Sequence, residues 1–257
     1  MKKQPKPLTC ETDYYAARQE GAVVVFSPKG NQLLTHTILR AKESVQDFLY
    51  RVESHPEVRI VLLMPQPRHA RREEYLSFFD MVRSARISDM SVMRLYRCID
   101  QLILQILDSD LFFVAADCGQ ILPMFACISL ACDYRILGEN AVFQNPALEL
   151  GLIPKGGSAW FLSRMLGGAK ALELILARES ISVQEALDLG IVNCCVPAEN
   201  FEEEALAIAR KFEALPETSL CLAKRLVNNS WRDLPDYLEY ENRELFKSLN
   251  QNLIATH

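Results

Sequence analysis

The sequence lacks several features that would place the protein in a specialised class. No apolar stretch reaches the roughly 18 residues that a membrane-spanning helix requires, and we find no repeat or low-complexity tract. The 257 residues carry 28 basic and 33 acidic side chains, a net charge of −5. Because nucleic acids and anionic lipids attract basic surfaces, we expect neither a nucleic acid nor a membrane as a partner.

Histidine is scarce, and the cysteines are not spaced as metal ligands. The four histidines are far apart along the chain, and the eight cysteines show no C-x-x-C pair. The sequence therefore predicts no metal site. The first residues also lack the apolar run of a secretory signal, so we expect free thiols in a reducing, cytoplasmic location.

The first part of the chain has the pattern of a βαβ unit. Residues 22–27 and 59–64 are short runs of consecutive apolar residues, as in strands buried on both faces. Residues 38–52 between them form a helix that ends before Pro56. This order predicts an α/β fold with a parallel sheet.

The pattern of strands and helices continues to about residue 197. Residues 92–106 place apolar side chains at spacings of three and four, which indicates a helix, and residues 111–116 follow as a strand. Two short strands are predicted at 134–137 and 141–144. From Gly151 onward the chain is mostly helical.

The last part of the chain is predicted to be entirely helical. Before it, Ser182 and Glu185 have the spacing of a capping box, and Gly190 suits the left-handed end of that helix. Three further helices are expected at about 199–212, 216–228 and 234–249. We therefore divide the chain into a core, residues 1–197, and a helical region for association, residues 198–257.

Several motifs resemble the enoyl-CoA hydratase/isomerase family, also called the crotonase superfamily. The stretch "SLACDYRILGENAVFQNPALELGLIPKGG" is similar to that family's "ALACDIRIASENARFGLPEVKLGLIPGGG", and "ISVQEALDLGIVNCCVP" is similar to "ISAEEALRLGLVNRVVP". The resemblance implies a crotonase-like spiral of ββα units with a C-terminal helical region. It also implies a homotrimer, or a hexamer built from two trimers.

The resemblance further implies chemistry on an acyl thioester. Two backbone N–H groups of the family hold the thioester oxygen while an enolate forms, and one of these donors corresponds to Met124. No cofactor is permanently bound, because coenzyme A or phosphopantetheine enters as part of the substrate. Lys224 matches a family lysine that in relatives can reach the nucleotide phosphates of a neighbouring subunit.

The sequence departs from the family at the residues that move protons. Where the family has "GGGCE" this chain has "PMFAC", which puts Cys127 in place of a hydratase glutamate, and Ala147 takes the place of the second. Since a positioned acid or base contributes ~10² to 10⁴ in rate, ordinary hydratase activity is not expected. The bulky residues Arg72–Tyr75 replace a small turn beside coenzyme A, so a substrate on an acyl carrier protein is an alternative.

Other residues are candidates for replacement chemistry, each with a simpler alternative. Cys127 is either a reactive thiolate or a small buried residue. Glu149 is either a lone catalytic carboxylate or a surface ion pair. His69 is either a group that titrates at the pocket or an exposed loop residue. Arg72, with the nearby arginines, and Lys155 are either ligands for a phosphate or carboxylate, or solvated side chains.

Two functions remain open from the sequence alone. The first is a divergent enzyme that isomerises, cleaves or decarboxylates an acyl thioester through its enolate. The second is a catalytically inactive relative that keeps the crotonase fold as a scaffolding or interaction subunit. The missing glutamates favour the second, and the tolerance of the family's chemistry for changed acids and bases favours the first.

Overall fold

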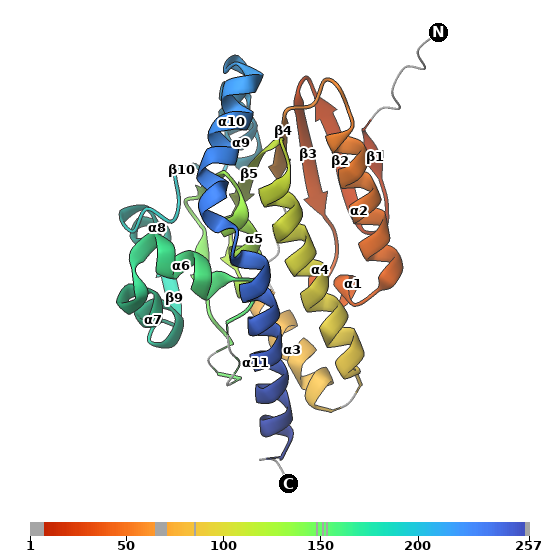
Figure 1. Cartoon of the computed structure of the whole chain (residues 1–257), viewed down its shortest axis with the longest axis vertical. Helices are drawn as coiled ribbons and strands as arrows, with labels where there is room; N and C mark the ends of the chain where they lie inside the picture. The colour runs from red at the N-terminus through yellow and green to blue at the C-terminus, as the bar shows by residue number, and fades with distance from the viewer. Residues whose placement is uncertain are drawn as a thin grey trace.

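A computed structural model describes residues 8–64, 71–84, 86–147, 149–150, 152 and 154–254. The chain forms a seven-stranded sheet with helices on both faces (Figure 1). The strands lie in the order β1 (Cys10–Glu11), β2 (Tyr15–Glu20), β3 (Val23–Pro28), β4 (Ile60–Leu63), β5 (Phe112–Asp117), β7 (Tyr134–Gly138) and β10 (Cys194–Val196). The strands from β3 to β10 are parallel, as predicted, and β1 and β2 add an antiparallel edge.

The central strands are apolar on consecutive residues because both faces of the sheet are covered. In β3, Val24 and Phe26 belong to one core, whereas Val23 and Val25 belong to a second core on the opposite face. All four are at most 4% exposed. The prediction of strands buried on both faces is therefore confirmed for β3 and β4.

Helices α1 (Gln32–His36), α2 (Leu39–Glu53), α3 (Arg71–Arg83) and α4 (Asp89–Asp108) lie between these strands in the chain. The apolar stripe predicted for α4 is buried from Val92 to Ile106, apart from the half-buried Leu102. Ser88 begins α4 by accepting a hydrogen bond from the Ser91 N–H at 3.3 Å. The stripe packs on the sheet, so α4 forms one wall of the larger core.

A smaller three-stranded sheet contains β6 (Gln120–Ile121), β8 (Val142–Gln144) and β9 (Ser180–Ser182). Both strands predicted after residue 133 exist, but β7 belongs to the main sheet and β8 to the small one. Gly119 has a φ of +67°, a conformation that glycine adopts without strain, and it turns the chain from β5 into β6. Helix α5 (Pro123–Ala131) begins directly after β6.

Helices α6 (Ser158–Leu166), α7 (Gly168–Leu176) and α8 (Val183–Asp188) form a lobe beside the small sheet (Figure 1). The capping box of α8 is confirmed, because the Ser182 hydroxyl accepts from the Glu185 N–H and the Glu185 carboxylate accepts from the Ser182 N–H. Gly190 has a φ of +70°, as its place after the helix predicts.

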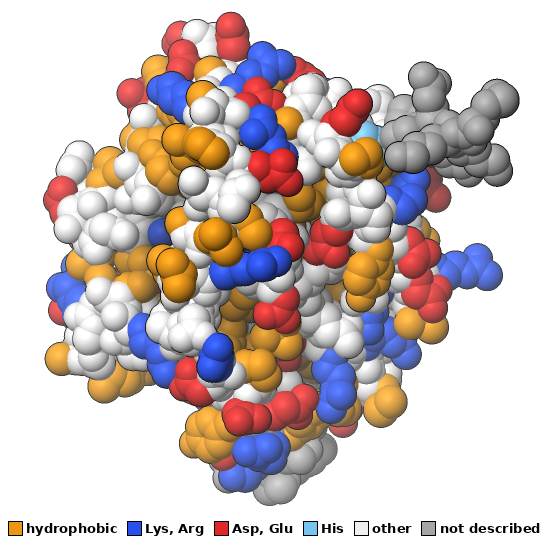
Figure 2. Space-filling view, turned by 45° about the horizontal axis from the view of Figure 1, so that its top comes forward, with side chains coloured by type: hydrophobic (Ala, Val, Ile, Leu, Met, Phe, Trp, Pro, Cys, Tyr) orange, Lys and Arg blue, Asp and Glu red, His pale blue; other side chains and the backbone are white. Residues whose placement is uncertain are grey.

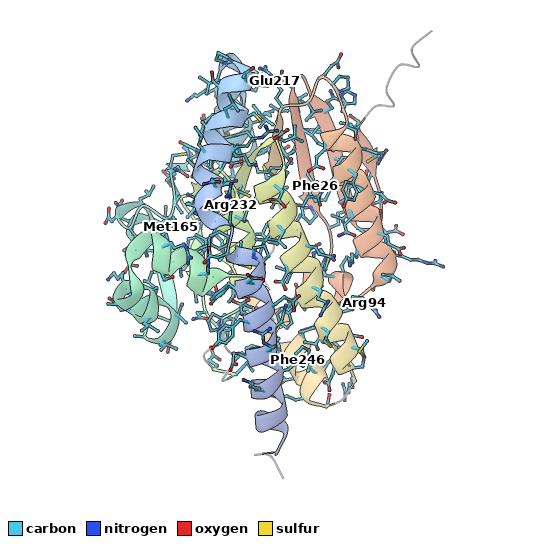
Figure 3. All side chains as sticks on the ribbon, in the orientation of Figure 1. Phe26, Arg94, Met165, Glu217, Arg232 and Phe246 are labelled. Atoms are coloured by element: carbon cyan, nitrogen blue, oxygen red, sulfur yellow. The ribbon has the colours of Figure 1, made fainter. Side chains whose placement is uncertain are left out.

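The three predicted tail helices are α9 (Phe201–Lys211), α10 (Glu217–Asn228) and α11 (Leu234–Ile254). Pro216 directly precedes α10 instead of lying in its first turn. Helix α9 covers the second face of the main sheet, where Phe201, Ala205 and Ala209 join its core. Helix α11 lies along α4 (Figure 3). The division of the chain into a core and a helical region at residue 197 stays a prediction. Helix α9 follows that position and still contributes residues to the core of the main sheet.

One face of the molecule is drawn with its side chains coloured by type in Figure 2. On the face drawn in Figure 2, acidic and basic side chains are interspersed with apolar ones. Within the described residues, no helix is both long enough and apolar enough to cross a bilayer.

The structure gives Lys224 a buried position with partners inside the chain, and the phosphate contact that the resemblance implies stays a prediction. Its side chain is 2% exposed, and Nζ lies 2.9 Å from Asp133 Oδ2. Nζ also donates to the carbonyl oxygens of Ile106 at 2.8 Å and Leu111 at 2.7 Å. These contacts occupy the ammonium inside the chain, where it connects α10 to α4 and to the start of β5.

We predict that Lys224→Met lowers the free energy of unfolding by about 3–5 kcal/mol, because it leaves the buried carboxylate of Asp133 without its cation. Urea denaturation measures the loss. Arg225→Met on the same helix is the control, since the Arg225–Asp110 pair is exposed and its removal changes stability little. Equal losses in the two variants would contradict the structural role of Lys224.

Candidate active site

Met124, the position at which the resemblance implies a backbone donor, lies at the start of α5. Leu122 caps the helix in an extended conformation and Pro123 is its first residue, a position that proline tolerates. Met124 follows as the second residue. The first amides of a helix have no acceptor within the helix, and the helix dipole adds partial positive charge there. The side chain of Met124 lies outside the described part of the structure.

The start of α3 lies next to the same segment. The backbone N–H of Arg72 donates to Gln120 Oε1 at 3.2 Å, and Gln120 is in β6, which leads directly into α5. Tyr75, one turn into α3, lines the cavity described below. Two helix N-termini therefore border the same region, where the partial positive charge of the helix dipoles favours a developing negative charge.

A largely apolar cavity of about 140 Å³ lies against the start of α5. Pro123, Ala126 and Cys127 of α5 form part of its wall. The apolar side chains of the remaining wall come mainly from α4, α7 and the small sheet: Leu95, Ile99, Ile121, Leu130, Phe143, Ala147, Leu152, Leu162, Leu174, Ile181 and Ile191. Such a wall suits an apolar acyl group.

Cys127 fills a tight place in this wall. Its side chain is 1% exposed, and a Cβ added at Gly156 would lie only 2.4 Å from Cys127 Sγ. Gly156 also has a φ of +66°, so this position requires glycine for both reasons. Burial raises the pKa of the Cys127 thiol well above its usual range. A protonated thiol is a poor nucleophile, which favours the small buried residue over the reactive thiolate.

Lys155 also lines the cavity and connects it to a buried polar network. Lys155 Nζ donates to Asn242 Oδ1 at 2.7 Å and to Glu241 Oε2 at 3.1 Å. Glu241 accepts from the Gly157 N–H, and Asn242 donates to Asp100 Oδ2 at 2.8 Å. This Lys155 network joins α4, α11 and the loop before α6, and each of its side chains is at most 9% exposed.

Both acids of the Lys155 network have a raised pKa, with desolvation by burial as the main cause in each. The nearby ammonium of Lys155 opposes the shift for Asp100 and Glu241 but does not cancel it. Asp100 Oδ1 is buried with no hydrogen-bond partner among the described residues. Ionising both acids beside one cation is therefore unfavourable, and the network favours retaining a proton.

The other predicted site residues, where the structure describes them, are not part of the cavity wall. Arg72 and Glu149, which were predicted for different roles, form an ion pair with each other. Neither Glu149 nor Lys224 lines the cavity. This ion pair matches the simpler interpretation of Glu149. His69 lies outside the described residues.

Asn145 and Cys118 have partners or packing inside the protein. Asn145 lines the cavity, but its amide Nδ2 donates to the Ile175 carbonyl at 3.0 Å. Cys118 lies in the core on the opposite face of the main sheet. Among the residues that the structure describes, no cluster of His, Cys, Asp or Glu has the arrangement of a metal site.

The sequence did not lead us to predict Asp100 and Glu241 as members of the Lys155 network, although it carries a signal for Glu241. Leu234, Leu238, Glu241 and Leu245 follow one helix face, and all four are at most 4% exposed. An acid in an apolar stripe of this kind needs a buried partner. The sequence does not indicate that this partner is Lys155, because the two are far apart in the chain.

We predict that the stability gained by Asp100→Asn grows as the pH rises. Burial raises the pKa of Asp100 in the folded protein above its unfolded pKa of about 3.9. The Asp100 carboxyl group therefore costs no stability below the unfolded pKa. The cost develops as the pH rises from the unfolded pKa through the folded pKa. Urea denaturation of wild type and variant at a series of pH values measures this difference.

Asp110→Asn is the matched control, with the opposite sign. The hydrogen bond from Arg225 lowers the pKa of Asp110, so that carboxylate stabilises the fold above its unfolded pKa and loses this effect as the pH falls. A pH-independent difference for Asp100→Asn would contradict the raised pKa.

Comparison of the sequence with known proteins finds similarity to enoyl-CoA hydratases. A sequence model described as enoyl-CoA hydratase/isomerase matches residues 85–254. A probable mitochondrial enoyl-CoA hydratase of Dictyostelium discoideum is 35% identical over 117 residues, 45% of this chain and 42% of that protein. A probable enoyl-CoA hydratase of Bacillus subtilis is 43% identical over 104 residues, 40% of each chain. The matched part thus spans less than half the length of these two relatives.

Solved structures show the same fold over nearly the whole chain. An enoyl-CoA hydratase from Bacillus halodurans has a TM-score of 0.78 at 18% identity, covering 94% of this chain and 97% of that one. The enzyme from Bacillus anthracis has a TM-score of 0.73 at 23% identity, covering 93% and 92%. With the family match over most of the chain, these likenesses show that the protein belongs to the enoyl-CoA hydratase/isomerase family and has the crotonase fold.

Proposed function

We propose that the protein is an enzyme that acts on an acyl thioester through its enolate, as an isomerase, lyase or decarboxylase and not as a standard hydratase. The observation that carries this proposal is the apolar cavity against the start of α5, with Cys127 and Ala147 in its wall where the family has glutamates. Membership of the family supports acyl-CoA as the substrate class.

The two helix starts supply the oxyanion site in this proposal. The Met124 N–H is one donor to the thioester oxygen, and the first-turn amides of α3 are the source of the second. Such preorganised donors contribute ~2.7 to 4 kcal/mol each when charge develops on the oxygen. The apolar wall strengthens them because it excludes water from the site.

The absence of the two family glutamates argues against hydration. Adding water to an enoyl thioester requires a base to activate the water and an acid to protonate the α-carbon, and neither a thiol with a raised pKa nor an alanine does this. An isomerisation or decarboxylation through the enolate needs only the oxyanion site and one group that moves a proton.

The thioester carrier is coenzyme A or the phosphopantetheine of an acyl carrier protein. The Arg72–Glu149 ion pair joins the start of α3 to the loop after β8, where the resemblance places the nucleotide end of coenzyme A. A carrier protein would not need that part of the site. Because all eight cysteines are free thiols, we also propose a cytoplasmic location.

We also propose a homotrimer, or a hexamer of two trimers. Helix α10 exposes Leu222, Leu226 and Val227 by 49%, 78% and 61%, an apolar surface that a second copy would cover. Leu226→Asp is expected to shift the mass measured by light scattering toward that of the monomer. A wild-type protein that is monomeric at micromolar concentration would contradict this assignment.

Turnover of thioesters tests the proposed function. Enoyl, β,γ-unsaturated and β-carboxyacyl thioesters of coenzyme A and pantetheine are supplied, and products are followed by mass spectrometry. We expect isomerisation or decarboxylation without detectable hydration. Replacing Met124 with its α-hydroxy analogue, which removes only the N–H, is expected to lower kcat by ~10² to 10³.

Two results would contradict the proposal. Efficient hydration of an enoyl thioester would show that the protein is a hydratase despite residues 127 and 147. Binding without turnover of any thioester, or no binding at all, would favour the inactive scaffolding subunit.

A further inference from the structure

A reaction through an enolate needs a group that exchanges a proton with the α-carbon, and the cavity offers few. At the α5 end of the cavity, the titratable side chains in the described wall are Tyr75, Tyr96, Cys127 and Lys155. Burial raises the pKa values of the two tyrosines and of Cys127, so these three groups hold their protons firmly at neutral pH.

The charged groups elsewhere in the wall are bound to other parts of the chain. Arg135 donates to the carbonyl oxygens of Cys132 and Ile191, both at 2.7 Å. Arg178 forms an ion pair with Glu185, and Glu179 is exposed at the edge of β9. Lys155 is the charged side chain in the described wall whose neighbour in the chain, Gly156, contacts Cys127 of α5.

The geometry of Lys155 suits proton transfer. Its two hydrogen bonds, to Glu241 and Asn242, use two of the three N–H groups of an ammonium. Nζ lies 5.0 Å from the centre of the Tyr96 ring, which itself lines the cavity. The next residue, Gly156, contacts Cys127, which stands in the position of a family glutamate. Lys155 is thus held close to the place that the missing acid would occupy.

The hydrogen bonds of Lys155 fix the position of its ammonium. Glu241 is bonded directly to Nζ, and Asn242 connects the ammonium to Asp100. Burial raises the pKa of both acids. Lys155 lines the cavity, whereas Asp100, Glu241 and Asn242 do not.

We propose that Lys155 is the catalytic residue that transfers a proton to the α-carbon of the enolate, with Glu241 and Asn242 as its positioning residues. This inference rests on the proposed function. In the step, the electron pair of the enolate takes a proton from Nζ, a C–H bond forms, and the N–H bond breaks to leave a neutral amine. The amine regains a proton from solvent. In reverse, the neutral amine removes the α-proton and the charge moves to the thioester oxygen.

Exchange of the α-hydrogen of saturated acyl-CoA in D2O, followed by mass spectrometry, measures this step in both directions. Lys155→Met is expected to slow exchange by ~10² to 10⁴ while the affinity for the acyl-CoA, from calorimetry, changes little. Because that variant leaves Glu241 without its cation, Lys155→Met with Glu241→Gln is made alongside it. The glutamine still accepts from the Gly157 N–H.

Lys155→Arg separates catalysis from structure. Arginine keeps the positive charge beside Glu241 but does not give up its proton, so we expect stability and binding to be retained and exchange to be lost. Tyr75→Phe and Tyr96→Phe are controls for the neighbouring hydroxyls, and both are expected to keep exchange within a few fold of wild type.

The outcomes distinguish this inference from the proposed function. If wild type neither binds nor exchanges any acyl thioester, the proposed function fails. If wild type exchanges and the folded double variant exchanges equally fast, only the role of Lys155 is wrong. Loss of exchange in a tyrosine variant, with exchange retained in Lys155→Arg, would assign the proton transfer to that tyrosine instead.

Discussion

The ammonium of Lys155, held between Glu241 and Asn242, is the interaction on which the candidate site depends. It brings a charged group to a largely apolar wall, which also contains Arg135, Arg178 and Glu179, and connects that wall to α4 and α11. Burying a cation and two acids is unfavourable unless each is paired, and here the pairing also fixes the loop that contains Gly156 and Gly157. The same contacts that stabilise the C-terminal helix therefore shape the cavity.

The main sheet provides the framework that brings two helix N-termini to this cavity. Parallel strands buried on both faces fix β5, and the turn at Gly119 and strand β6 then place α5. The hydrogen bond from the Arg72 N–H to Gln120 places the start of α3 beside it. Met124 and Phe125 keep their backbone N–H groups, and Pro123 has none, so the donor implied at Met124 is compatible with the replacement of the family glycines at these three positions.

The sequence predicted the framework well and the site only in part. Periodicity located β3, β4 and α4, because local patterns report burial directly. The resemblance identified the family, and the changes that it implies at residues 127 and 147 stay predictions. The buried contacts of Lys224 and the partners of Lys155 were missed, because both depend on contacts between residues about 80 or more positions apart, such as Lys155 with Glu241. Short-range patterns contain no information on such pairs.

The central claim is that a thioester polarised by the α5 amide meets the amine of Lys155 and no carboxylate. A crystal structure with an acyl-CoA analogue that mimics the enolate tests it most directly. The account predicts the analogue's oxygen about 2.7–3.1 Å from the Met124 nitrogen, with Lys155 Nζ as the titratable group in contact with the α-carbon. An analogue bound elsewhere, or an α-carbon in contact with a carboxylate, would contradict it.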